Sequence, residues 1–245
     1  MARTARRHSE SGYAHLIMRG NNKQVLFEEE DDYRFFISRL GKYCRETKVR
    51  INAYCLMENH VHLLVHDRQG NTPQMMRKLG VSYSGYYNRK YERSGHLFQG
   101  RYLCEPIGDD PYLLTVFRYI LNNPRKAGIC SADQYRWSSY KAFFKKMPSI
   151  DLDFLKDRIT TEEAYRQYIG TDSDDACMEY ERPDRGDEQA METIRSLLGV
   201  TSGSELQQLE SKERNSALQI LKAEGLSVRQ IERLTGISRN IIQRA

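Results

Sequence analysis

The chain has 245 residues, 39% of them hydrophobic and 10% aromatic, which is the composition of a folded protein with one large core and a smaller domain. No run of 18 or more apolar residues occurs, and the basic residues 1–7 precede no apolar segment, so we expect neither a membrane span nor a secretory signal. We therefore expect a cytoplasmic protein without a membrane partner. The five cysteines are odd in number and include no C-x-x-C pair, which argues against a disulfide framework and a structural zinc site.

The net charge of +5 is unevenly distributed along the chain. Residues 1–147 hold 25 Lys and Arg against 14 Asp and Glu, residues 148–192 hold 5 against 14, and residues 193–245 hold 8 against 5. A basic segment in a chain with 16 tyrosines suits a nucleic-acid partner, because cations neutralise phosphates and aromatic rings stack on unpaired bases. An ordinary solvated surface explains the same charge equally well.

The first part of the chain alternates strand-like and helix-like segments. Residues 13–18 form a short apolar run that ends in a turn signal, which indicates a strand. The acidic cluster at residues 28–32 is typical of a helix N-terminus, and apolar residues then recur at helical spacing through residues 33–44. Residues 49–56 mix β-branched and aromatic side chains, and we expect them to form a hairpin with residues 60–65.

A second helix and a further strand follow. Thr72 is the expected N-cap and Pro73 the expected first helical position of the helix. Residues 97–107 are strand-like apart from Gly100 and Pro106. The order strand, helix, strand, strand, helix, strand is that of the ferredoxin-like fold, so we predict an α+β domain with an antiparallel sheet.

Two histidines lie in the apolar segment of residues 57–65. Successive side chains of a strand point to opposite faces, so His60 and His62 emerge side by side. Two neighbouring imidazoles suit a divalent metal, although two half-buried, hydrogen-bonded histidines would give the same pattern. His66 shares their face, but it lies about 13 Å from His62 along the strand and is too far away to join the same ion.

A third helix is expected, with a cap at Asp109 and a proline start at Pro111, and it should end before Pro124. The expected packed stripe comprises Leu114, Phe117 and Leu121. Tyr119 lies about 200° around the helix from its stripe neighbours, so its ring is expected to point away from the stripe. Asn123, four residues later, is expected on the same face as Tyr119.

Composition and helical patterns divide the whole chain into three parts. We expect residues 1–147 to form the first domain and residues 148–186 to form an acidic connector, with two short helices possible within residues 152–168. Residues 187–245 carry helical patterns and are expected to form a small all-α domain.

The end of the chain follows the pattern of a helix-turn-helix. Ser227 is placed to cap one short helix, Gly236 to turn the chain and Ser238 to cap a second helix. A small helical protein-binding module would show the same signals, so DNA binding and protein binding both remain open here.

Four segments, in order and at similar spacing, resemble the REP-associated tyrosine transposases, which are single-strand DNA endonucleases of the HUH class. The four segments are residues 13–21 (YAHLIMRGN), 54–65 (YCLMENHVHLLV), 95–102 (GHLFQGRY) and 119–128 (YILNNPRKAG). The resemblance covers about residues 10–145. The C-terminal helical segment is an addition relative to the shorter members of that family.

The resemblance implies a ferredoxin-like catalytic domain in which His60 and His62 bind Mg²⁺ or Mn²⁺ and Asn123 supplies a further ligand. Tyr119 falls on the position of the nucleophile, which attacks a phosphate of the DNA and becomes joined to the 5′ end. Attack by another strand's 3′ hydroxyl then gives strand transfer, and hence transposition or recombination, without a nucleotide cofactor. The implied substrate is single-stranded DNA or a hairpin-forming repeat with a single-stranded guide beside it.

Several polar residues are candidates for contacts with such DNA. They are Arg19, Lys23, Arg89, Lys90 and Arg101 in the first domain, and Ser238, Arg239, Asn240 and Gln243 at the end of the chain. Whether the protein is a monomer or a homodimer stays open. Two alternative functions also remain at this point, a catalytically inactive DNA-binding regulator and a metallo-phosphohydrolase that uses water in place of Tyr119.

Overall fold

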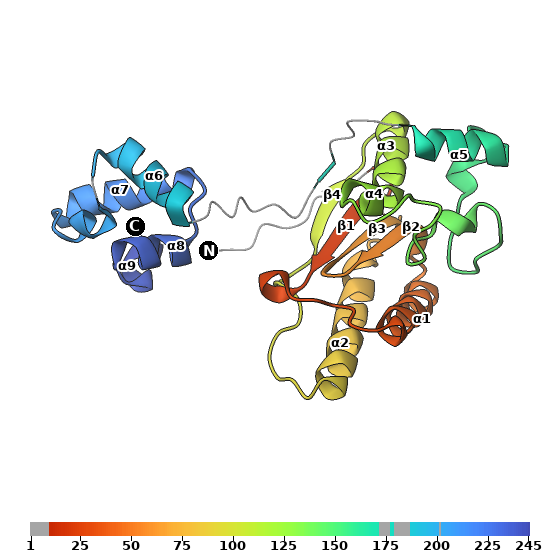
Figure 1. Cartoon of the computed structure of the whole chain (residues 1–245), viewed down its shortest axis with the longest axis horizontal. Helices are drawn as coiled ribbons and strands as arrows, with labels where there is room; N and C mark the ends of the chain where they lie inside the picture. The colour runs from red at the N-terminus through yellow and green to blue at the C-terminus, as the bar shows by residue number, and fades with distance from the viewer. Residues whose placement is uncertain (1–9, 172–176, 179–186, 201) are drawn as a thin grey trace. The chain divides into compact units, whose positions relative to one another are not determined.

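The computed structural model describes residues 10–171, 177–178, 187–200 and 202–245. The chain divides into two compact units, residues 1–180 and residues 181–245, which we call the sheet unit and the helical unit (Figure 1). None of the helices in these described ranges is long and apolar enough to cross a membrane.

The sheet unit is built on four antiparallel strands in the order β2-β3-β1-β4. The strands are β1 (Tyr13–Arg19), β2 (Arg50–Met57), β3 (His60–His66) and β4 (Leu103–Pro106). Helices α1 (Glu30–Thr47) and α2 (Thr72–Lys90) connect β1 to β2 and β3 to β4, and the short 3₁₀ helix η1 (Asn21–Lys23) follows β1. This order confirms the predicted ferredoxin-like arrangement.

Helices cover both faces of the sheet. Figure 1 shows α1 and α2 on one side of the sheet and α3 (Asp110–Leu121) on the other. Leu16, Val61 and Leu63 pack into the core under α1 and α2. Cys55 and Leu64 pack into a second core under α3. The alternation along β3 therefore places the expected apolar residues on the α1–α2 face and His62 on the α3 face.

Three element boundaries differ from the sequence expectation. The last strand is shorter than residues 97–107, because Gly100 has a positive φ of 72° and turns the chain before β4. The N-cap of α2 is Asn71 instead of Thr72, whose amide and hydroxyl both donate to Asp67. The third helix ends at Leu121, and Asn123 opens the separate short helix α4 (Asn123–Lys126).

The segment after α4 packs back onto the sheet unit. It contains η2 (Tyr140–Ala142), η3 (Asp153–Leu155) and α5 (Glu162–Gly170). The rings of Phe154 and Tyr165 both contact Phe117 of α3. The first part of the expected connector, residues 148–186, is thus folded against α3, while its residues 172–176 and 179–186 lie outside the described residues.

The helical unit contains α6 (Asp187–Leu198), η4 (Gly203–Gln207), α7 (Ser211–Ala223), α8 (Val228–Thr235) and α9 (Arg239–Arg244). Ser227 caps α8 and forms a capping box with Gln230. Gly236 ends α8 in the left-handed conformation with φ 71°, and Ser238 is the N-cap of α9. The predicted caps and turn are therefore present in the described part of this unit.

Candidate functional site

His60 and His62 of β3 lie together at one end of the sheet. Arg19 pairs with His60 and Ile17 pairs with His62 across the β1–β3 ladder. The ring centroids of His60 and His62 are 5.0 Å apart, with an interplanar angle of 81°. His62 is 2% exposed and His60 is half-buried, so the pair extends from the second core toward the surface.

A buried chain of polar groups supports His62 from the neighbouring strands. His15 of β1 is fully buried, and its Nε2 lies 3.0 Å from Nδ1 of His62. On the other side of the His15 ring, Nδ1 lies 3.5 Å from Oε2 of Glu105, its direct cross-strand partner on β4. Tyr112 of α3 donates its hydroxyl to the other oxygen of Glu105 at 2.9 Å. Three strands and one helix therefore converge on this chain of groups.

The ionisation states of Glu105 and His15 determine which ring nitrogens of His15 and His62 carry a proton. Burial alone would raise the pKa of Glu105, but contacts from His15 and Tyr112 outweigh it and lower the pKa, so the carboxylate is ionised and only accepts. Burial lowers the pKa of His15, although Glu105 opposes this shift, and the ring is neutral at pH 7. Nδ1 of His15 therefore carries its proton, and Nε2 accepts the proton on Nδ1 of His62.

His62 is left with one nitrogen for coordination. Burial, with added repulsion from His15 and His60, lowers the pKa of His62 well below its ordinary value, so its ring is also neutral. Because Nδ1 of His62 is engaged by His15, Nε2 is the nitrogen that this ring would offer to an ion. Nδ1 of His60 lies 2.7 Å from Oδ1 of Asn59, which makes Nε2 the corresponding atom of His60.

The ring of Tyr119, on α3, lies beside His15 and His62. Its ring is 2% exposed and meets His15 and His62 edge-on, with centroid distances of 6.0 and 5.8 Å. Nζ of Lys126, from α4, lies 4.4 Å from the centre of the Tyr119 ring. The buried residues of α3 are Leu113, Val116, Phe117, Tyr119, Ile120 and Leu121, whereas Leu114, which was expected in the packed stripe, is only partly buried. Tyr119 thus points toward the histidines, away from the face of α3 that Phe117 packs against Phe154 and Tyr165.

Asn123 lies beside Tyr119 although the helix between them is interrupted. Asn122 has φ −90° and ψ 2°, close enough to helical values that the spacing of four residues still brings the two side chains together. Nδ2 of Asn123 donates to the carbonyl oxygen of Tyr119 at 3.0 Å, and the residue is 8% exposed. Its Oδ1 is the atom that would serve as an oxygen ligand.

The donor set fits a divalent cation. Metal-binding histidines commonly engage their second ring nitrogen with a polar partner, as His62 and His60 do here. An amide oxygen from Asn123, water and phosphate oxygens would complete a mixed shell suited to Mg²⁺ or Mn²⁺. Among the described residues, no group of three or more His, Cys, Asp and Glu side chains is arranged to hold a metal, so an ion here would depend on the two imidazoles and the amide.

The candidate DNA-contacting residues of the sheet unit are placed unequally. Arg19 lies across from His60, and the backbone of Lys23 accepts from the Asn59 side chain, so both lie at the histidine end of the sheet. Lys90 is instead bound to Glu29 and to the buried Asp32, at 3.0 and 2.7 Å. Its ammonium is therefore committed to an internal ion cluster.

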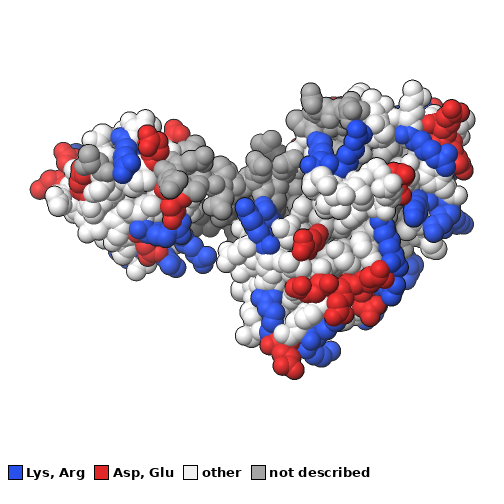
Figure 2. Space-filling view, viewed as in Figure 1, with Lys and Arg blue, Asp and Glu red and all other residues white. Residues whose placement is uncertain are grey.

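The remaining candidates are exposed. Arg89 and Arg101 lie on the surface of the sheet unit, and Ser238, Arg239, Asn240 and Gln243 are exposed on and beside α9. Arg239 pairs with Glu232. On the face drawn in Figure 2, the Lys and Arg side chains of the sheet unit lie in several separate groups beside an Asp and Glu cluster. Contacts with DNA on this face would therefore be local and not along one continuous basic stripe.

Sequence reasoning missed His15 and Glu105. His15 lies within the family-like segment of residues 13–21 but received no role, Glu105 lies outside all four segments, and each is remote from the histidine strand along the chain. The signal that could have found them is the pairing register. Once β1 and β4 are aligned, His15 and Glu105 face each other directly, and His15 is diagonal to His62.

The part of the chain that carries this site is similar to a known protein family. Residues 8–123, which include His60, His62, Tyr119 and Asn123, match the family model described as IS200-like transposase. A structure of the REP-associated tyrosine transposase bound to a REP hairpin matches with a TM-score of 0.53 and 14% identity, over 74% of this chain and all of that chain. This likeness shows a shared fold.

A candidate transposase from Deinococcus radiodurans R1 is 20% identical over 49% of this chain and 96% of its own, but the TM-score of 0.34 is too low to support a conclusion. A comparison with curated protein sequences gives no match. The match over residues 8–123 and the ferredoxin-like order of the strands agree, and the part of the chain that carries the candidate site is similar to the IS200-like transposases.

Proposed function

We propose that the sheet unit is a metal-dependent single-strand DNA endonuclease and strand transferase that acts on hairpin-forming repeats. The observation that carries the proposal is the contact of the Tyr119 ring with His62, in a domain similar to the IS200-like transposases. The solved structure with the same fold holds a REP hairpin, which supports hairpin DNA with adjoining single strand as the substrate.

Tyr119 is the proposed nucleophile. Its oxygen attacks the scissile phosphorus, the phenol proton leaves, and the bond to the 3′ oxygen breaks to give a free 3′ hydroxyl and a 5′-phosphotyrosine. The phosphotyrosine retains an ester bond, so the 3′ hydroxyl of another strand can attack it and regenerate Tyr119. Lys126, above the ring, supplies a positive charge close to the oxygen that becomes negative during attack.

His60, His62 and Asn123 are the residues that would hold Mg²⁺ or Mn²⁺. When bound, the ion would polarise the scissile phosphate and neutralise the charge that builds on it. His15 and Glu105 act on His62 itself, because Glu105 faces Nδ1 of His15 and Nε2 of His15 contacts Nδ1 of His62, an arrangement that favours the His62 tautomer with an unprotonated Nε2. The role of the protein in this step is to orient its ligands and to keep them uncharged.

A covalent adduct tests the assignment. Labelled hairpin oligonucleotides with single-stranded flanks, incubated with the protein and Mg²⁺, should give a protein–DNA adduct that resists denaturation. Tyr119→Phe removes only the hydroxyl and should abolish the adduct, while a Tyr43→Phe control on α1, on the opposite face of the sheet, should keep it. An adduct that survives in Tyr119→Phe would disprove the assignment, and cutting without any adduct would favour the hydrolytic alternative.

For the helical unit we propose DNA binding through α9. The support is local, since Ser238, Arg239, Asn240 and Gln243 are exposed at a helix that follows a capped helix and a left-handed glycine turn. Replacing Asn240 and Gln243 together by Ala should weaken binding to the preferred duplex by about tenfold or more, since each bidentate base contact contributes about 1–3 kcal/mol. Unchanged binding in an electrophoretic mobility assay would favour a protein-binding module.

A further inference from the structure

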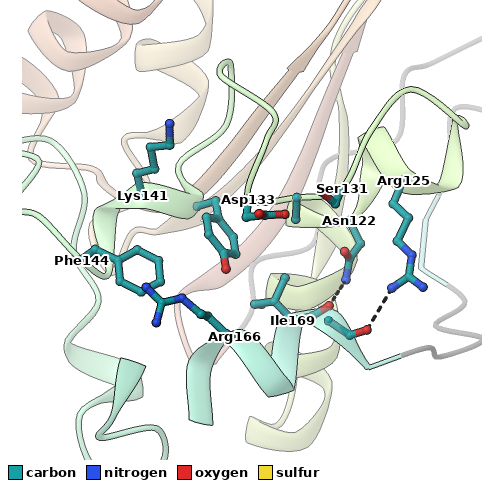
Figure 3. Close-up of a pocket in the computed structure, with 11 residues that line it drawn as sticks. Asn122, Arg125, Ser131, Asp133, Lys141, Phe144, Arg166 and Ile169 are labelled. Carbon is teal, nitrogen blue, oxygen red and sulfur yellow. Dashed lines mark hydrogen bonds between the residues drawn. The ribbon is translucent and has the colours of Figure 1, made fainter. Parts of the chain in front are cut away.

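One cavity in the sheet unit is lined by residues that have no role assigned so far. It has a volume of about 440 Å³ and opens between α4, α5 and the segment of residues 131–144 (Figure 3). We call it the α4–α5 pocket. Its volume falls within the range of pockets that bind small ligands, about 300–1,000 Å³.

The lining of the α4–α5 pocket combines cations with aromatic surface. Arg125, Lys141 and Arg166 lie at its rim with a single carboxylate, Asp133. Phe144 forms part of the wall, and the floor includes the buried residues Tyr140 and Ile169. An excess of positive charge over an aromatic floor matches a ligand that is both anionic and planar.

One end of the pocket is already arranged as a stacking platform. The guanidinium of Arg166 lies over the Phe144 ring, 4.6 Å from its centre, and Figure 3 shows the two side chains next to each other. Arg166 also pairs with Glu162 at 3.2 Å, but both side chains are 59% exposed, so this pair contributes little and a phosphate can replace it. Guanidinium planes and aromatic rings are the surfaces on which unpaired bases stack.

Two further cations can meet a phosphate. The Lys141 ammonium makes no ion pair or hydrogen bond with any other described residue. Arg125 donates to the carbonyl of Gly170 at 2.9 Å, which holds its guanidinium at the edge of the pocket. In Figure 3, Arg125 and Asn122 line the end of the pocket opposite Phe144.

The α4–α5 pocket is close to the proposed nucleophile. Asn122 lines it and donates to the carbonyl of Ile169 at 2.7 Å. Asn122 follows Tyr119 by three residues, a spacing that puts the Cβ atoms about 5–6 Å apart on a helix. A DNA strand with its scissile phosphate at Tyr119 therefore has neighbouring nucleotides within reach of the pocket.

We propose that the α4–α5 pocket binds an unpaired nucleotide of the single-stranded DNA that flanks the hairpin. The base stacks on the Arg166 guanidinium, and its phosphates contact Lys141 and Arg125. This inference rests on the proposed function of the sheet unit, since it assigns a binding site to the single-stranded part of the same substrate.

Equilibrium binding of two probes tests the inference. Fluorescein-labelled dT12 represents the single strand, and a blunt-ended hairpin without any tail represents the stem. Anisotropy is measured on the full chain in EDTA, so that no cleavage occurs and the result does not depend on Tyr119 or on a metal. Arg166→Ala should weaken dT12 binding about fivefold or more, because stacking contributes about 1–3 kcal/mol per base, and should leave hairpin binding unchanged. Lys141→Ala should lower the slope of log affinity against log salt by about 0.7.

A matched control separates a specific site from general charge. Arg34 of α1 pairs with Glu30 at four-residue spacing and is 56% exposed, so Arg34→Ala removes the same charge from an equivalent pair elsewhere on the sheet unit. Arg34→Ala should leave dT12 binding unchanged. Equal losses in Arg34→Ala and Arg166→Ala would overturn the inference, and so would wild-type protein that fails to bind dT12.

Crosslinking locates the nucleotide directly. A dT12 analogue with 5-iodo-deoxyuridine at its central positions should crosslink to a peptide that contains Tyr140, Phe144 or Arg166, because a base stacked on the Arg166 guanidinium lies among these side chains. Crosslinks confined to other peptides would refute the site. A protein that forms this crosslink but no covalent tyrosine adduct in Mg²⁺ would retain the pocket and lose the proposed nuclease activity, so the two failures are distinguishable.

Discussion

Replacing His15 by Leu tests whether the buried chain from Glu105 to His62 prepares the site for a metal. Leucine has a similar size and suits a fully buried strand position, so the sheet should still form. The change removes the acceptor 3.0 Å from Nδ1 of His62 and the group that faces Glu105. The His62 ring then loses the contact that decides its tautomer.

The expected losses of metal affinity and of folding stability in His15→Leu both follow from these contacts. Loss of a hydrogen-bonding partner that orients a metal ligand lowers metal affinity by about 10–100-fold. Leaving a buried ring nitrogen without its partner costs about 1–3 kcal/mol of unfolding free energy, partly offset by the apolar surface of the new side chain. For a unit of this size, each 1 kcal/mol corresponds to about 2–4 °C in the unfolding temperature.

Calorimetric titration with Mn²⁺ and nitrogen NMR of labelled histidines provide the measurements. The wild-type spectrum should show His62 protonated at Nδ1, and His15→Leu should show a mixture of tautomers together with weaker Mn²⁺ binding. His66→Leu is the control, since His66 lies at the other end of β3 and stacks on Tyr13. Equal Mn²⁺ affinity in His15→Leu, His66→Leu and the wild type would refute the reasoning.

Two further predictions concern charge. Asp32 is buried and accepts from the amides of Glu28 and Glu29, from Tyr86 and Tyr91, and from Lys90. Asp32→Ala should therefore lower the unfolding free energy by about 3 kcal/mol in urea denaturation. Burial alone would raise the pKa of Asp32, but its donors outweigh burial and lower it, so its stabilising contribution is complete above the unfolded value of about 3.9 and is lost as the pH falls through the lower folded value. Asp32→Asn should flatten the unfolding temperature between pH 5 and pH 2 in scanning calorimetry, and an unchanged profile would contradict the assignment. Lys126→Ala should slow formation of the Tyr119 adduct about 5- to 10-fold without changing hairpin affinity, because the ammonium over the ring stabilises developing phenolate charge by about 1 kcal/mol. A rate equal to that of the wild type in a single-turnover adduct assay would exclude this role.

The order of elements in the sheet unit was predictable because each element carries its own local signal. Asp109, for example, was expected to begin a helix, and its side chain accepts from the amide of Tyr112 as an N-cap. The length of β4 was not predictable from strand propensity. Residues 97–102 make only an isolated bridge, Gly20 with Phe98, because positive φ at Gly100 redirects the chain before the regular ladder with β1 begins.

The candidate site was predictable only in part. Alternation along β3 placed His60 and His62 on one side of the sheet, but residue spacing could not select Tyr119 among 16 tyrosines, and its assignment came from resemblance. His15 and Glu105 depend on the β1–β3 and β1–β4 registers, which are properties of the assembled sheet. Likewise, Lys90 looked like any surface cation because Asp32, its partner, lies 58 residues earlier in the chain.

The burial of Tyr119 does not by itself distinguish a nucleophile from a core aromatic, since a tyrosine packed in the core would also be almost inaccessible. The neighbours of the ring favour the proposed role as a nucleophile. Tyr165, a core tyrosine of the same unit, is surrounded by aromatic rings and donates its hydroxyl to a backbone carbonyl. The Tyr119 ring instead contacts two neutral imidazoles and a lysine ammonium. A hydrophobic core does not require three nitrogen-bearing groups around one ring, whereas attack on a phosphate requires ligands, charge and a nucleophile in one place.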